Sequence, residues 1–125
     1  MTMKSGSVDT APTAVNLDAA TALFHSLSDA TRLAILRRLA VGEARVVDLT
    51  SELGLAQSTV SAHLACLRDC GLVDYRPQGR ASVYRLICEE LMQMFRAAEA
   101  VLEATGSAVA LCPTYGHPPE RKEAR

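Results

Sequence analysis

The fold of this chain is decided by residues 48–86, DLTSELGLAQSTVSAHLACLRDCGLVDYRPQGRASVYRL. In the first part of this stretch apolar residues recur at helical spacing, and the pattern predicts one short helix at about 46–53 and a longer one at about 57–69. The connection between them, Leu53-Gly54-Leu55, is as tight as the turn of a helix–turn–helix. The stretch therefore predicts a helix–turn–helix unit.

The hydrophobic period changes from 3.6 to 2 after Gly71, which ends the second of these helices. Alternating residues at 72–76 and 81–86 predict two short strands, and Pro77-Gln78-Gly79-Arg80 between them is typical of a hairpin turn. A helix–turn–helix followed by a β-hairpin is the order of a winged helix–turn–helix, a mainly α fold with one hairpin.

The flanking sequence supplies the remaining helices and suggests the domain boundaries. Helical spacing of apolar residues predicts further helices at about 17–27, 29–42 and 88–105. We expect a disordered N-terminal arm at 1–14, the winged helix–turn–helix DNA-binding domain at 15–106, and a tail at 107–125 that is mostly disordered beyond Tyr115.

The composition sets limits on the class of protein. The chain has 125 residues, 49% hydrophobic and 22% charged, which fits one globular domain with an aliphatic core. Neither a membrane-spanning run nor a signal peptide is visible, so we expect a cytoplasmic protein without a membrane partner. The net charge of −1 excludes non-specific polybasic binding but not a local basic face. Catalytic motifs are absent, and we expect no enzyme.

Polar residues gather at the start of the predicted 57–69 helix, where a recognition helix contacts base edges. They are Gln57, Ser58, Thr59, Ser61 and, one turn later, His63. Glutamine can bond adenine, and serine and threonine can bond bases or phosphates, although both also serve as helix caps. Arg80 at the hairpin tip can reach a phosphate. We therefore expect these six residues to contact DNA.

Three cysteines form a candidate thiolate site for a soft metal ion. Cys66 and Cys70 are one helical turn apart, which places their Cβ atoms about 5–6 Å from each other. Cys112 lies in a polar, proline-rich tail where no core requires a cysteine. Three thiolates suit Cd(II) or Pb(II), and Zn(II), Hg(II) or As(III) also accept sulfur. We expect Cys88 to be a buried structural cysteine. Whether Cys88 or His117 adds a metal ligand is open.

The segment DATRLAILRRL at 29–39, together with the 48–86 stretch, resembles the ArsR/SmtB family of metal-sensing bacterial repressors. The resemblance covers about 17–102 and rests on DATR, the helix STVSAHLACL, GLV and the hairpin. It implies a homodimer that binds operator DNA through the winged helix and leaves it when metal binds. It also implies a dimer interface between the first and last helices, where we expect four residues to be buried: Leu23, Leu91, Phe95 and Leu102.

The cysteine pattern narrows the resemblance to one branch of the family. Arg45-Val46-Val47-Asp48-Leu49 stands where arsenic and cadmium sensors of one type carry cysteines, and the last helix lacks the histidines of zinc, nickel and cobalt sensors. The pair Cys66 and Cys70 with a C-terminal cysteine resembles the cadmium- and lead-sensing CmtR branch, with Cys112 supplied by the same or the other protomer. Two alternatives remain: a repressor that senses thiol oxidation through these cysteines, and a helical protein-interaction module.

Overall fold

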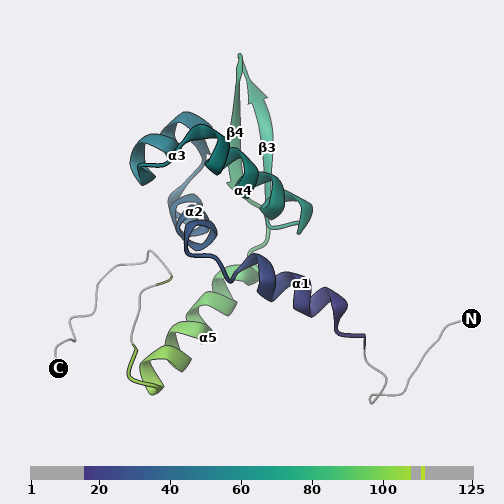
Figure 1. The fold of residues 1–125 in the computed structure, drawn as a ribbon, viewed down its shortest axis with the longest axis vertical. Helices are drawn as coiled ribbons and strands as arrows, with labels where there is room; N and C mark the ends of the chain where they lie inside the picture. Colours follow the sequence, from purple (N-terminus) through teal and green to yellow (C-terminus); the bar gives the residue numbers. More distant parts are fainter. Residues whose placement is uncertain (1–15, 108–110, 112–125) are drawn as a thin grey trace, which may run out of the picture.

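The structure is a computed structural model that describes residues 16–107 and residue 111. Five helices and three strands follow one another as α1 (Asp18–Ser26), α2 (Ala30–Val41), β2 (Ala44–Arg45), α3 (Val46–Leu53), α4 (Gln57–Asp69), β3 (Val73–Gln78), β4 (Ala81–Leu86) and α5 (Glu90–Ala104) (Figure 1). The expected arm at 1–14 and most of the expected tail at 107–125 lie outside the described residues. All five predicted helices and both hairpin strands are confirmed.

A three-stranded antiparallel sheet of order β2-β4-β3 supports the hairpin. β4 is the central strand. Its Tyr84 lies opposite Tyr75 of β3 on one side and opposite Ala44 of β2 on the other. Two residues are too few to show a period, so β2 was not predictable. Its effect is to fix the start of α3 beside the hairpin.

The core lies where α2, α3 and α4 meet the sheet. The apolar residues Val60, Leu64 and Leu67, at helical spacing along α4, are fully buried, as are Ile35 and Leu36 of α2. α4 therefore has one apolar side in the core and its polar side outside. Figure 1 shows the hairpin, α3 and α4 at one end of the molecule, and α1 and α5 extending from the other.

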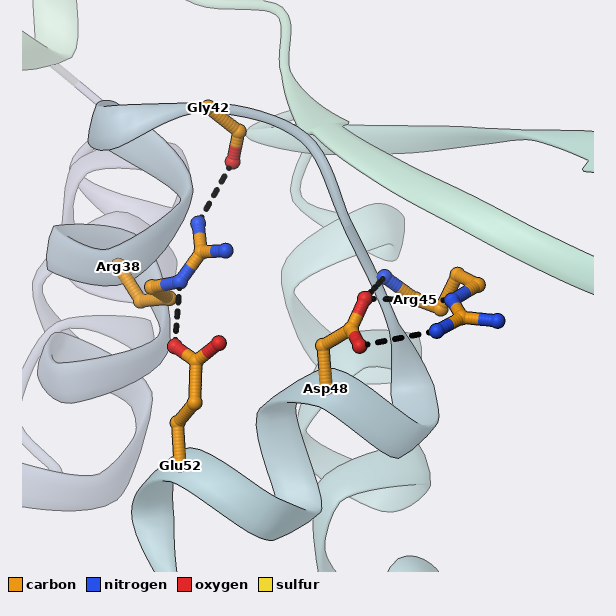
Figure 2. Close-up of polar contacts among 5 residues, drawn as sticks. All are labelled: Arg38, Gly42, Arg45, Asp48 and Glu52. Carbon is orange, nitrogen blue, oxygen red and sulfur yellow. Dashed lines mark hydrogen bonds and ion pairs between the residues drawn. The ribbon is translucent and has the colours of Figure 1, made fainter.

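Ion pairs hold α3 in place (Figure 2). The Arg38 guanidinium donates to Glu52 Oε1 at 2.6 Å and to the Gly42 carbonyl at 3.0 Å, which ties α2 to α3. At the start of α3, Asp48 accepts from the backbone N–H of Arg45 at 3.0 Å and thereby caps the helix. α3 then ends at Gly54, whose φ of 69° is the left-handed conformation that glycine adopts easily.

In the described part of the chain, no helix has the length and apolar character needed to cross a membrane.

Candidate nucleic-acid interface and thiol pair

The first turns of α4 present an uninterrupted polar surface. Gln57, Ser58, Thr59 and Ser61 are all exposed. The residue that caps this helix is Ala56, which makes no side-chain cap bond, so the neighbouring hydroxyls are not used for capping. Within the described residues none of the four side chains has a hydrogen-bond partner. They are free to bond an external partner, and the N-terminal N–H groups of α4 favour an anion.

An open groove of about 440 Å³ runs between α4, the start of α3 and the hairpin. Polar side chains from all three elements line it: Arg45, Thr50, Gln57, Ser61, Arg80 and Tyr84. The structure thus brings together Gln57, Ser61 and Arg80, which the sequence predicted as DNA contacts, and places two arginines among hydroxyl and amide groups. This combination of charge and hydrogen-bond donors suits a phosphate backbone beside base edges.

The hairpin carries charge at its tip. Gly79 has a φ of 63°, a conformation that allows the tight turn, and Arg80 follows it as an exposed residue. Arg76, earlier in the hairpin, is paired with Glu43 at 2.7 Å. Arg80 and Arg85 make no ion pair with the other described residues, so their charges are available to a partner.

Arg45 is a groove residue that the sequence did not reveal. Its guanidinium pairs with Asp48 at 3.2 Å, visible in Figure 2. The side-chain hydrogen bond from Arg45 lowers the pKa of Asp48, and the same bond raises the pKa of Arg45. Both groups are therefore charged at neutral pH, and the pair fixes the position of the Arg45 guanidinium at the groove. Only the pairing of β2 with β4 brings Arg45 near Arg80, so no local pattern could have indicated it.

His63, predicted to contact DNA, lies half-buried on α4 against α2. Its Nδ1 atom is 3.3 Å from the Arg32 guanidinium, which also donates to the Ser26 carbonyl at 2.6 Å. His63 therefore has a partner inside the protein, unlike the four polar residues before it. Its contact with DNA stays a prediction.

An aromatic stack joins α4 to the hairpin. The Arg68 guanidinium lies 4.5 Å from the centre of the Tyr75 ring, and that ring lies 5.3 Å from the Tyr84 ring. Burial raises the pKa of Tyr84 and Tyr75 adds to the effect, against a smaller opposing effect of Arg68, so its phenol stays protonated. Because Tyr84 lines the groove, the stack connects the end of α4 with the groove wall.

The two α4 thiols lie at the end of that helix. Cys66 is half-buried, and Cys70 is exposed at the helix C-terminus, with its Sγ 2.7 Å from the Ser26 hydroxyl. Two accessible thiols one turn apart suit a soft ion as part of its ligand set. Among residues 16–107 and 111, no three His, Cys, Asp or Glu side chains are placed to hold a metal.

Cys112 lies outside the described residues, as does His117. Its neighbour Leu111 is described: the Leu111 amide donates to Glu99 Oε2 at 2.6 Å, and its side chain packs against the core. The chain therefore returns to α5 just before Cys112. Cys88 also packs against the core, and its thiol contacts Glu90 at 3.6 Å.

The residues expected at a dimer interface fall into two groups. Leu91 and Phe95 are 2% exposed within the single chain, so a second chain could cover almost none of their surface. Leu23 and Leu102 are half-buried. The apolar surface that α1 and α5 leave open belongs to other residues: Leu17, Phe24 and Val101, each about 60% exposed. The expected dimer contacts of Leu23, Leu91, Phe95 and Leu102 therefore stay a prediction, since the sequence does not tell which apolar face packs on the protomer's own core.

Comparison with known proteins places the chain in a family. Residues 29–75 match the family model described as "Bacterial regulatory protein, arsR family". A "Transcriptional repressor SmtB homolog" from Synechocystis is 35% identical over 88 residues, which is 68% of this chain and 67% of that protein. The "HTH-type transcriptional regulator CmtR" of Mycobacterium tuberculosis is 45% identical over 64 residues, 51% of this chain and 54% of that one.

Solved structures agree with the sequence matches. The homodimeric winged helix-turn-helix DNA-binding domain Mb0332 from Mycobacterium bovis, described as a possible ArsR-family transcriptional regulator, superposes with a TM-score of 0.66 at 30% identity. It covers 81% of this chain and 91% of that domain. The chain spans about half the length of several curated relatives that it matches, CmtR among them. With a match that covers two thirds of the SmtB homolog, this winged helix–turn–helix chain belongs to the ArsR/SmtB family of transcriptional regulators.

Proposed function

We propose that this chain is a repressor that binds double-stranded operator DNA as a homodimer and is released when a thiophilic metal ion binds its cysteines. The observation that carries the DNA part is the polar face of α4 beside a groove with two arginines. Gln57, Ser58, Thr59 and Ser61 bond base edges and nearby phosphates. Arg80, whose charge is not taken up by an ion pair among the described residues, neutralises a phosphate beside the bases.

The DNA proposal is tested by measuring duplex affinity over a range of salt concentrations. Arg80→Ala weakens binding to all sequences similarly and lowers the slope of log affinity against log salt by about one, because one phosphate contact is lost. Arg96→Ala is the matched control, since Arg96 is an exposed arginine of α5. Figure 1 shows α5 at the other end of the molecule from the hairpin. If Arg80→Ala loses affinity only through one base position, Arg80 does not have the proposed phosphate role. If the wild-type protein has no affinity for duplex DNA even at low salt, the protein-interaction alternative is favoured.

For the metal part, the inferred ligands are Cys66, Cys70 and Cys112. Support comes from the two thiols one helical turn apart, from the cysteine pattern, and from Leu111, the residue before Cys112, whose amide donates to Glu99 of α5. Cd(II) or Pb(II) is the proposed inducer, because three thiolates satisfy such large soft ions. Zn(II), Hg(II) and As(III) accept the same ligands and are included in the test.

The metal proposal is tested by ultraviolet absorption from sulfur-to-metal charge transfer. With Cd(II) or Pb(II) the band appears in the intact chain and is lost in Cys66→Ser and Cys70→Ser, because each breaks the pair of thiolates one helical turn apart that holds the ion. Cys88→Ser is the matched control and keeps it. Full-affinity binding in both α4 variants rejects the site.

Operator release, titrated with each ion in turn, identifies the inducer and tests the rival mechanism. Cys112→Ser keeps metal on the α4 pair but loses most of the effect on DNA, if the tail draws α4 away from its DNA-bound position. Release by a thiol oxidant in the absence of metal, together with no response to any ion, favours the redox-sensing alternative.

A further inference from the structure

Ser26, the last residue of α1, is the buried polar residue of the described chain, with 2% of its surface exposed. A buried hydroxyl requires hydrogen-bond partners, since leaving it unpaired is costly. Ser26 Oγ has two: the Ala22 carbonyl at 3.0 Å and Cys70 Sγ at 2.7 Å. One of these partners is a sulfur atom of the candidate thiolate site.

The chemistry of the three groups gives the direction of these bonds. The Ala22 carbonyl only accepts, so the single Ser26 hydrogen is donated to it. The Ser26 oxygen is then left to accept the hydrogen of the Cys70 thiol. A chain of two bonds thus runs from the end of α4, through Ser26, to the backbone of α1.

A second contact joins the same two helices. Arg32 donates from Nε to the Ser26 carbonyl at 2.6 Å, and its guanidinium lies 3.3 Å from His63 of α4. His63 and Cys70 are seven residues apart, which puts them on one face of α4 about two turns from each other. The last turn of α1 is therefore held to α4 at two points, one of them Cys70 itself.

We propose that Ser26 is a positioning residue for Cys70, and that its hydroxyl links the state of this thiol to the last turn of α1. This inference rests on the proposed metal response of Cys70. A sulfur bound to metal has no hydrogen to donate and only accepts. The Ser26 hydroxyl must then turn from Ala22 toward the sulfur, or Cys70 must leave Ser26. Either change alters how α1 is held against α4, and α1 carries exposed apolar surface for a partner chain.

The contact itself is tested in the metal-free protein with a double-mutant cycle. Unfolding equilibrium constants are measured at one protein concentration for the wild type, Ser26→Ala, Cys70→Ala and the double variant. A direct hydrogen bond makes the combined effect differ from the product of the single effects by about 2- to 10-fold. Ser28→Ala is the matched control: Ser28 Oγ bonds the His25 carbonyl, and its effect multiplies simply with that of Cys70→Ala. If the effect of the Ser26→Ala and Cys70→Ala double variant equals the product of the two single effects, the proposal is overturned.

The link to α1 is tested by amide hydrogen exchange in its last turn, with and without Cd(II). In the wild type Cd(II) changes the exchange rates there by about 3-fold or more. In Ser26→Ala the charge-transfer band remains but the response in α1 is lost, and Ser26→Thr, which keeps a hydroxyl, restores it. An equal response in Ser26→Ala overturns the link. If no charge-transfer band forms in the wild type, the proposed metal response is wrong. The double-mutant cycle, which uses the metal-free protein, still tests the contact between Ser26 and Cys70.

Discussion

At the scale of single residues, Asp29 shows how one side chain starts a helix and makes it sensitive to pH. Asp29 caps α2 and accepts from the backbone N–H groups of Thr31 at 2.7 Å and Arg32 at 3.0 Å. These bonds are stronger to the charged carboxylate than to the neutral carboxyl, and the Arg32 bond in particular lowers the pKa of Asp29. Because the pKa is lower in the folded state, the stabilisation is complete above the unfolded value of about 3.9 and is lost as the pH falls further.

We predict that Asp29→Asn removes this pH dependence. Asparagine also caps helices, but it neither carries a charge nor titrates. The variant is therefore less stable than the wild type at pH 7, and the difference in melting temperature closes as the pH falls through the lowered folded-state pKa of Asp29 and the wild-type carboxyl is protonated. Asp29→Ala is the comparison, because it loses the cap at both pH values. Thermal unfolding followed by circular dichroism gives the melting temperatures of the wild type and both variants. A difference between the wild type and Asp29→Asn that stays the same at low pH contradicts the prediction.

Single residues also show where the sequence sufficed for the candidate site. The exposed face of α4 could be predicted, because Val60, Leu64 and Leu67 define the buried side and leave Gln57 and Ser61 outside. The partners of Cys70 could not be predicted, because Ser26 is 44 residues away and its approach depends on how α1 packs on α4. Local periodicity carries the first kind of information and not the second.

At the scale of elements, the helices and hairpin followed from pattern, whereas the groove between them did not. Gly54 and Gly71 end α3 and α4 where the sequence predicted, since both have positive φ. The groove requires β2, a two-residue strand paired to β4 across 38 residues of sequence, to bring Arg45 beside the hairpin. Such pairing has no local signal, which is why Arg45 and Tyr84 were missed.

The stack of Arg68, Tyr75 and Tyr84 yields the prediction at this scale. Tyr75→Leu removes the ring between the other two and lowers the free energy of unfolding by about 1–2 kcal/mol, from the lost aromatic and cation–π contacts. It also weakens duplex binding several-fold, because α4 and the hairpin are no longer held together, while the slope against salt stays the same since no phosphate contact is removed.

Tyr75→Phe serves as the control for the stack, because it keeps the ring and both contacts. Chemical denaturation gives the stability of each variant, and fluorescence anisotropy of a labelled duplex gives its affinity. Wild-type duplex affinity in Tyr75→Leu, despite the loss of stability, means that α4 and the hairpin bind DNA without the stack.

At the scale of the whole molecule, α1 and α5 have apolar surface that the protomer's own core does not cover. The protomer core buries Leu91 and Phe95, while Phe24 and Val101 stay about 60% exposed. Exposed apolar side chains on two helices are typical of a subunit interface, and the Mycobacterium bovis domain of the same fold is described as homodimeric. We therefore infer that the dimer interface uses these exposed residues of α1 and α5, the helices at which the family resemblance places the interface.

We predict that Phe24→Ala weakens the homodimer. In a twofold interface each substitution acts in both protomers. Full burial of a phenylalanine side chain contributes about 1.5–3 kcal/mol, and about 60% of Phe24 is exposed and free to be buried by a partner. The expected loss is about 2–4 kcal/mol, which is a 30- to 1000-fold rise in the dimer dissociation constant. Sedimentation velocity over a concentration series measures this constant. Val41→Ala is the control, because Val41 is 70% exposed but ends α2, outside the α1 and α5 pair. If Phe24→Ala raises the dissociation constant no more than Val41→Ala does, the dimer interface lies on another face. Ser26 then lies apart from the subunit contact.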